Sequence, residues 1–242
     1  MMLKTRLRAS LVHAAISALV LAGLFVFAGL TWFPFGLFVV GGGAEGSTIL
    51  LLVDVVLGPA LTFIIYNTVK TRSQLVRDIS IIALVQVACL IAGACTIYNS
   101  RPVAVVHLYD TFYVLREADY KEYDLDVQGL KDLPGGYPKV VFVPVEGDAA
   151  QFFIGSVLRG LNDNLPRYLN IAEYKPLLEA PYEEVFGSGA LAENGRVLRD
   201  VMSVYASGSI HFDVNTLTFS GYRDGESVSE LKGATATIEP NL

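Results

Sequence analysis

The carboxylate of Asp54 is the most unusual chemical group in this sequence, because it lies inside the long apolar stretch of residues 48–69. A carboxylate in hydrocarbon is unfavourable by about 2.5 to 3.5 kcal/mol on insertion scales, and such groups are functional by default. Four residues on, Gly58 and Pro59 disturb the helix, since Pro59 removes one hydrogen bond and crowds the carbonyl of Val55. We expect Asp54 either to contact a partner or to make a structural hydrogen bond, beside carbonyls that need donors.

Three further polar residues lie at a common depth if the apolar stretches are helices. With a rise of about 1.5 Å per residue, Ser17, Thr62 and Gln86 all fall roughly 10 Å from one boundary. They are predicted to share hydrogen bonds in a polar layer. The alternative is that Ser17 and Thr62 bond to their own preceding turn.

The same depth count predicts the neighbours of Asp54 on the third apolar stretch. They should be Gly93 and Thr96, and Gly93 would let two helix backbones approach closely. Arg101-Pro102 follows directly at the exit of that stretch.

No set of residues in the sequence has the spacing of a catalytic site. There is no G-x-S-x-G nucleophile elbow and no cysteine outside the apolar stretches. His107 with Asp110, and His211 with Asp213, could each pair a base with an orienting carboxylate, but no nucleophile accompanies them. We therefore interpret both histidines as structural and do not expect an enzyme.

Metal and cofactor sites are not indicated either. His13, His107 and His211 are isolated, with none of the His and Cys spacings typical of metal sites. Cys89 and Cys95 are six positions apart in one apolar stretch, on different faces of a helix, so a disulfide between them is not expected.

Three apolar stretches, residues 11–30, 48–69 and 79–98, are each about long enough to cross a bilayer. The first is longer than the apolar region of a signal peptide and lacks a clear A-x-A cleavage site. We predict a membrane protein with a three-transmembrane-helix N-terminal bundle over residues 1–100. Residues 101–242 have the size and composition of one independently folded domain.

The distribution of basic residues predicts the orientation of the protein in the membrane. The loop of residues 31–47 has no Lys or Arg, whereas six basic residues flank the other helix ends: Lys4, Arg6, Arg8, Lys70, Arg72 and Arg77. By the positive-inside rule, the N-terminus and the second loop lie in the cytoplasm, and the domain of residues 101–242 is extracytoplasmic, in a bacterial periplasm.

The first external loop contains two local patterns. Its aromatic start, Trp32-Phe33-Pro34-Phe35, suits the headgroup layer of a membrane. Residues 41–48 resemble a phosphate loop superficially, but the required Lys is missing, so a flexible turn is predicted.

The domain of residues 101–242 is predicted to be α+β. Strands are expected over residues 103–108, 111–115 and 139–145, followed by a helix over residues 148–160. A second helix is expected to begin near Asn194 and to end before Gly208, because Val197, Val201 and Val204 or Tyr205 would share one face. Residues 209–214 and 218–222 should form a hairpin across Asn215-Thr216. Residues 164–190 carry no clear pattern.

The same domain is acidic. It has twelve Lys and Arg against twenty-one Asp and Glu, a net charge of −9. Phosphate backbones require a basic surface, so nucleic acid is excluded as a partner. An acidic surface suits a cationic protein or simply solubility.

Several short motifs together resemble the TfpX/TfpZ family of type IV pilin accessory proteins. Their order and spacing match over the first 120 residues, and beyond residue 145 only the general layout is similar. The motifs are Trp32-x-Pro34-Phe35, Gly41-Gly42, the string from Asp54 through Gly58-Pro59 to Thr62, Leu75-x-x-Asp78, Gln86, Gly93, Tyr98 and Arg101-Pro102.

This resemblance implies a bacterial inner-membrane protein that is not an enzyme and assists the handling of a type IV pilin. Its implied partners are a pilin, the pilus assembly machinery and membrane lipid, with the bundle meeting the pilin helix and the external domain meeting the pilin head. The alternative is a membrane-tethered sensor whose external domain binds a small ligand. That alternative is weakened because the cytoplasmic parts are too short to hold an output domain.

Overall fold

A computed structural model describes residues 2–66, 70–145, 165–180, 192–193, 196–213, 215–216 and 218–225. The chain forms two compact units. The helical unit consists of Met1–Trp32 and Gly43–Ser100, and the sheet unit consists of Phe33–Gly42 and Arg101–Leu242. A division at residue 100 alone would place residues 33–42 with the helices, whereas in the structure they pack with the sheet.

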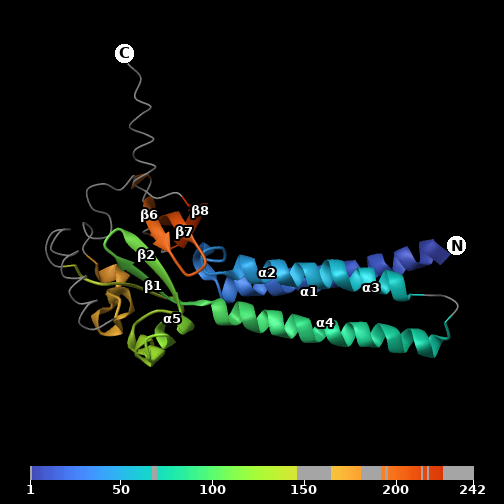
Figure 1. Ribbon diagram of the computed structural model, residues 1–242. Coiled ribbons are helices and arrows are strands. Elements are labelled where there is room, and N and C mark those ends of the chain that lie inside the picture. The colour runs from blue at the N-terminus through green and yellow to red at the C-terminus, as the bar shows by residue number, and fades with distance from the viewer. Residues whose placement is uncertain are drawn as a thin grey trace, which may run out of the picture. The chain divides into compact units, whose positions relative to one another are not determined.

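Three helices in the described part of the chain are long and apolar enough to span a membrane: Leu3–Thr31, Gly46–Ile65 and Arg72–Ser100. The first lies in α1 (Met2–Thr31) and the third is α4 (Arg72–Ser100). The second is composite, with α2 (Gly43–Leu51), a π-helical segment η2 (Leu52–Leu57) and α3 (Gly58–Ile65). Figure 1 shows α2 and α3 following one another along α1. The predicted membrane helices followed by a mixed domain are thus confirmed.

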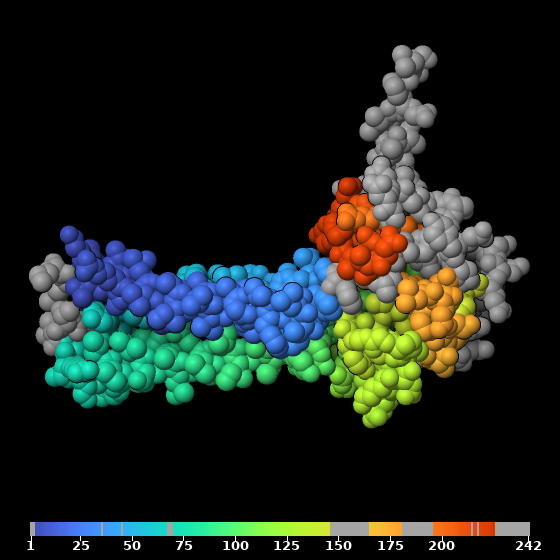
Figure 2. Space-filling model, turned by 180° about the vertical axis from the view of Figure 1, so that it is seen from behind, coloured from blue at the N-terminus to red at the C-terminus, as the bar shows by residue number. Residues whose placement is uncertain are grey.

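Glycines allow the second helix to lie close to α4. A Cβ atom on Gly93 would come within 2.3 Å of Leu50, and one on Gly46 within 2.7 Å of Ile97. The outward surfaces of α1 and α4, visible along their length in Figure 2, carry many exposed Leu, Val and Ile side chains. Such surfaces are stable in lipid and unfavourable in water.

The sequence Ser100-Arg101-Pro102 ends α4. A residue that precedes proline disfavours the helical conformation, because the proline ring collides with its backbone. The helix accordingly stops at Ser100, and Pro102, which is buried, is the first residue of strand β1.

The sheet unit is built on one mixed sheet with the strand order β4-β3-β1-β2-β6-β7-β8, and β5 pairs with β6. β1 runs parallel to β3, and β2 runs parallel to β6; the other pairs are antiparallel. The strands are β1 (Pro102–Leu108), β2 (Thr111–Arg116), β3 (Lys139–Phe142), β4 (Lys175–Pro176), β5 (Ala192–Glu193), β6 (Arg196–Met202), β7 (Ser207–Asp213) and β8 (Thr218–Asp224).

Short helices complete the sheet unit. They are the α-helix α5 (Glu117–Lys121) and the 3-10 helices η1 (Pro34–Gly36), η3 (Val127–Asp132), η4 (Arg167–Leu169), η5 (Ile171–Glu173) and η6 (Leu177–Glu179).

Both faces of the sheet are covered, so every residue of β1 is buried. One core contains Leu37 and Val40 from the loop together with Phe112, Phe212 and other side chains of the strands. The opposite core contains Tyr120, Leu130 and Tyr174. Residues 33–42 are therefore part of the hydrophobic core of the sheet unit rather than a linker between membrane helices.

Most predicted strands of this unit are confirmed. β1 and β2 match residues 103–108 and 111–115, β3 is shorter than predicted, and β7 and β8 form the predicted hairpin. The helix predicted over residues 148–160 lies outside the described residues.

The helix predicted from residue 194 is wrong, because Arg196–Met202 is strand β6. Val197 and Val201 are four residues apart, a spacing that puts them on one face of a strand as well as of a helix. Their β-branched side chains and the burial of Leu198 on the other face fit a strand covered on both sides.

One prediction for the first loop is wrong, and a second does not hold for Phe33. Residues 41–48 are not a flexible turn, because α2 begins at Gly43 and Ser47 donates a hydrogen bond to the Gly43 carbonyl. Phe33 is buried in the sheet unit and therefore cannot anchor the loop in headgroups. Trp32 instead packs edge to face against Phe27 and Tyr98.

Candidate functional site

The first polar site lies in the helical unit, at the π-helical segment η2. Asp54 belongs to this segment and is 5% exposed. The wider turn follows from Pro59, which has no N–H to donate, and the Gly58 N–H bonds to the Val53 carbonyl, five residues back. Such π-helical turns leave carbonyl groups without their usual partners and occur frequently at functional sites.

Gln86 of α4 fills the space beside this turn. Its Nε2 atom donates a long hydrogen bond of 3.5 Å to the Asp54 carbonyl oxygen. Gly58 leaves room for this side chain, because a Cβ atom at position 58 would lie 2.0 Å from the Gln86 Nε2 and would displace the end of the Gln86 side chain. The carboxylate oxygen Oδ1 of Asp54 has no hydrogen-bond partner among the described residues.

His13 of α1 forms the other side of this cluster. Its Nδ1 atom lies 2.6 Å from the hydroxyl oxygen of Thr62. One turn earlier, the Ser10 hydroxyl donates to the Pro59 carbonyl over 2.9 Å. His13 was missed as a site residue because it stands alone in its apolar stretch. The sequence did offer one signal for His13, because a polar side chain inside a membrane-spanning segment indicates a functional site.

The predicted polar layer is therefore wrong in its pairing. Thr62 pairs with His13 rather than with Ser17, and Gln86 lies beside Asp54 and Gly58. α4 begins seven residues earlier than predicted and the second helix begins at Gly43, so the depth count started from the wrong ends.

The predicted neighbours of Asp54 on α4 are wrong for the same reason. Gly93 packs against Leu50, and the Thr96 hydroxyl donates to the Ala92 carbonyl in its own helix. The structure brings together Asp54, Gly58, Pro59, Thr62 and Gln86, and it leaves Gly93 elsewhere on the same pair of helices.

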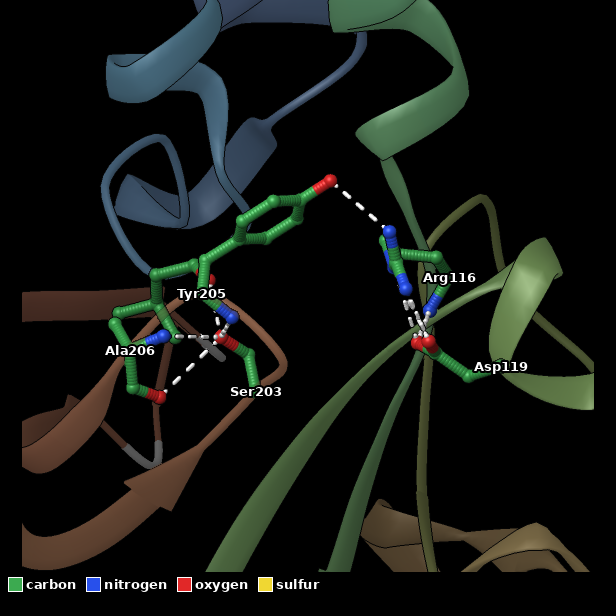
Figure 3. A network of polar contacts seen from close by, with 6 residues as sticks. Arg116, Asp119, Ser203, Tyr205 and Ala206 are labelled. Atoms are coloured by element: carbon green, nitrogen blue, oxygen red, sulfur yellow. Dashed lines mark hydrogen bonds and ion pairs between the residues drawn. The ribbon is translucent and has the colours of Figure 1, made fainter.

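A second polar network lies in the sheet unit, where Arg116 of β2 bonds in two directions (Figure 3). Its guanidinium donates to Asp119 over 2.6 Å and to the Tyr205 hydroxyl over 3.0 Å. The Asp119 carboxylate also accepts from the Arg116 backbone N–H, which caps helix α5. The hydrogen bond to Asp119 raises the pKa of Arg116, so this guanidinium stays charged.

At the other end of this network, side chains of the β6–β7 turn contact the loop of residues 33–42. The Ser203 hydroxyl donates to the Val40 carbonyl over 2.7 Å and accepts the N–H groups of Tyr205 and Ala206. The Tyr205 ring lies directly against Gly42. Ser203 and Tyr205 thus fasten the loop to the turn between β6 and β7 (Figure 3).

The remaining sequence-predicted residues do not form a site with these groups. Arg101 and Pro102 join α4 to β1, as described above. His107 is buried with its Nε2 atom unpartnered among the described residues, and Asp110 lies 4.0 Å from Arg199 instead. Burial, and then the Arg199 cation, lower the pKa of His107 to about 3. In the described residues, no group of three His, Cys, Asp or Glu could hold a metal ion.

These features define a membrane protein whose apolar helices enclose a polar cluster and whose chain continues into a mixed sheet. No family model matches the sequence, and no solved structure matches it. Over 102 residues, or 42% of this chain, it is 37% identical to the fimbrial assembly proteins of serogroups E1 and I of Dichelobacter nodosus. The match spans only 38% of the length of each of these two relatives.

The match covers a larger share of a third relative. The fimbrial assembly protein of serogroups C1 and C2 of Dichelobacter nodosus is 36% identical over 102 residues, which make up 76% of its length. The chain belongs to the family of fimbrial assembly proteins.

Proposed function

We propose that this chain is an accessory protein of the bacterial inner membrane that assists a type IV pilin before and during pilus assembly. It acts by binding, without catalysing a reaction. The fimbrial assembly proteins that it is similar to support the role in assembly. The three apolar helices and the motifs shared with pilin accessory proteins support a pilin, itself a membrane helix with a head domain, as the partner.

The orientation in this proposal has the N-terminus in the cytoplasm and the sheet unit in the periplasm. It is supported by the basic residues Lys4, Arg6 and Arg8 before the first span and by the absence of Lys and Arg in residues 31–47. A reporter that is active only in the cytoplasm, fused after Leu242, should be inactive. A strongly active fusion would show that the C-terminus is in the cytoplasm, which would contradict the proposed topology and the periplasmic role.

The observation that carries the proposal is the Asp54 carboxylate, buried among helices with one oxygen unpartnered in the described part of the chain. A buried acceptor without a donor costs about 1 to 3 kcal/mol, so such a group is not explained by helix packing alone. A donor from the membrane helix of a partner would satisfy it. Asp54 also lies in a π-helical turn, an irregularity that occurs frequently at functional sites.

Asp54→Asn tests this proposal, because it keeps the shape of the side chain and removes the charge. We expect a normal protein level in the membrane together with reduced pilus assembly, measured as surface pilin. Thr96→Val is the matched control, since Thr96 is an exposed position of α4 that bonds only within its own helix in the structure. Normal pilus assembly in Asp54→Asn at a normal protein level would defeat the proposal.

A further inference from the structure

The turn between β6 and β7, residues 203–206, is held rigidly by its own hydrogen bonds. The Ser203 N–H donates to the Ala206 carbonyl over 2.8 Å, and the Ser203 hydroxyl accepts two further N–H groups of the turn. The same hydroxyl donates to Val40. Figure 3 shows this turn with Tyr205 pointing toward Arg116.

Two apolar side chains, one on this turn and one directly before it, point into solvent. Val204 is 66% exposed and Met202, the last residue of β6, is 48% exposed. The segment itself is uncharged, because residues 201–210 contain no Asp, Glu, Lys or Arg. This is an unusual stretch of surface in a domain that carries a net charge of −9.

The residue that this turn packs against is close in the sequence to a spanning segment. Tyr205 packs against Gly42, and Gly42 is four residues before Gly46, where the second apolar span begins. Because α2 already begins at Gly43, these residues cover about 6 Å at a helical rise of about 1.5 Å. Gly42, against which the turn packs, is therefore joined to the start of the span by only a short stretch of chain.

We propose that the β6–β7 turn is a membrane-contact surface, with Val204 and Met202 inserted into the boundary between headgroups and acyl chains. Aliphatic side chains on a polar scaffold bind in that layer, about 5 to 10 Å deep. An uncharged turn also avoids the repulsion that an acidic domain experiences from anionic lipid. The bond from Ser203 to Val40 and the contact of Tyr205 with Gly42 keep the turn at this depth.

The test uses the full chain with Cys89→Ala and Cys95→Ala, reconstituted in vesicles of phosphatidylethanolamine and phosphatidylglycerol. Val204→Cys carries an environment-sensitive fluorophore, and doxyl-labelled lipid is the quencher. Asn215→Cys is the matched control, because Asn215 is exposed in the turn at the other end of the seven-residue strand β7. That end is about 23 Å away along an extended strand.

We expect the label at position 204 to be quenched by lipid at least about threefold more strongly than the label at position 215, as its depth in the interface requires. A second label, at Met202→Cys, should give the same result if the change at Val204 disturbs the turn. Equal quenching at positions 204 and 215 would overturn the proposal. The proposal would also be overturned if the fluorophore at position 204 entered an apolar environment only at a high ratio of protein to lipid. That result would mean that a second copy of the chain, rather than lipid, covers the turn.

Discussion

Tyr205 and Gly42, which are 163 positions apart in the sequence, pack so closely that no side chain fits between them. A Cβ atom on Gly42 would lie 2.3 Å from the Tyr205 ring, and Gly42 has a φ of +84°. Both the space and the backbone conformation therefore require glycine. This contact and the hydrogen bond from Ser203 to Val40 fasten the loop of residues 33–42 to the β6–β7 turn.

Gly42→Ala should destabilise the sheet unit by about 1 to 3 kcal/mol, since it combines a disfavoured φ with overpacking. The measurement is urea unfolding of the detergent-solubilised chain. Gly136→Ala is the control, because nothing lies within 4 Å of a Cβ atom at that position. Equal stability of the two variants would show that the Tyr205 ring can move to accommodate a Cβ atom at position 42 at little cost.

Leu37→Ala should cost about 2 to 5 kcal/mol, because Leu37 is fully buried in the core of the sheet unit and its truncation leaves a cavity. Leu178→Ala should have little effect, since Leu178 is 78% exposed. For the same reason, a fragment of residues 101–242 should fold poorly alone and improve when residues 33–42 are attached. Native-like stability of the bare fragment, measured by thermal unfolding, would refute the structural role of the loop.

His107 should make the sheet unit sensitive to acid. The pKa of His107 is about 3 in the folded chain, against an ordinary 6.5, so the unfolded chain binds the proton more readily. Stability is unaffected above pH 6.5 and falls as the pH drops toward 3, by about 1.4 kcal/mol per pH unit. His107→Phe should remove this slope in urea titrations between those pH values. An unchanged slope would assign the acid sensitivity to other groups.

Thr62→Val should weaken helix packing by about 0.6 kcal/mol, a typical value for an interhelical hydrogen bond in a membrane. It keeps the shape of the side chain and removes the hydroxyl that faces the Nδ1 atom of His13. Thr96→Val should be neutral, because Thr96 bonds to its own helix. Steric trapping in bicelles measures both values. A similar cost for the two variants would mean that the contact with His13 contributes nothing.

The sequence alone determined the parts of this protein that depend on local pattern. Long apolar stretches have to be buried in lipid, so the three spanning helices were predictable. Short runs of β-branched and aromatic residues predicted β1, β2 and the β7–β8 hairpin. Pro59 predicted the disturbed helix beside Asp54, because the loss of an N–H group is a property of the residue itself.

The tertiary structure decided everything that depends on which elements meet. Val197 and Val201 fit one face of a helix or of a strand, and only pairing with β2, β5 and β7 makes them part of a strand. His13 lies beside Thr62 because two helices pack in a particular register. Small errors in the predicted helix ends shift the predicted register by several residues, so this pair could not be found from the sequence. Leu37 and Val40 became core residues because the sheet offered them an apolar face, and no pattern within a ten-residue loop can reveal that face.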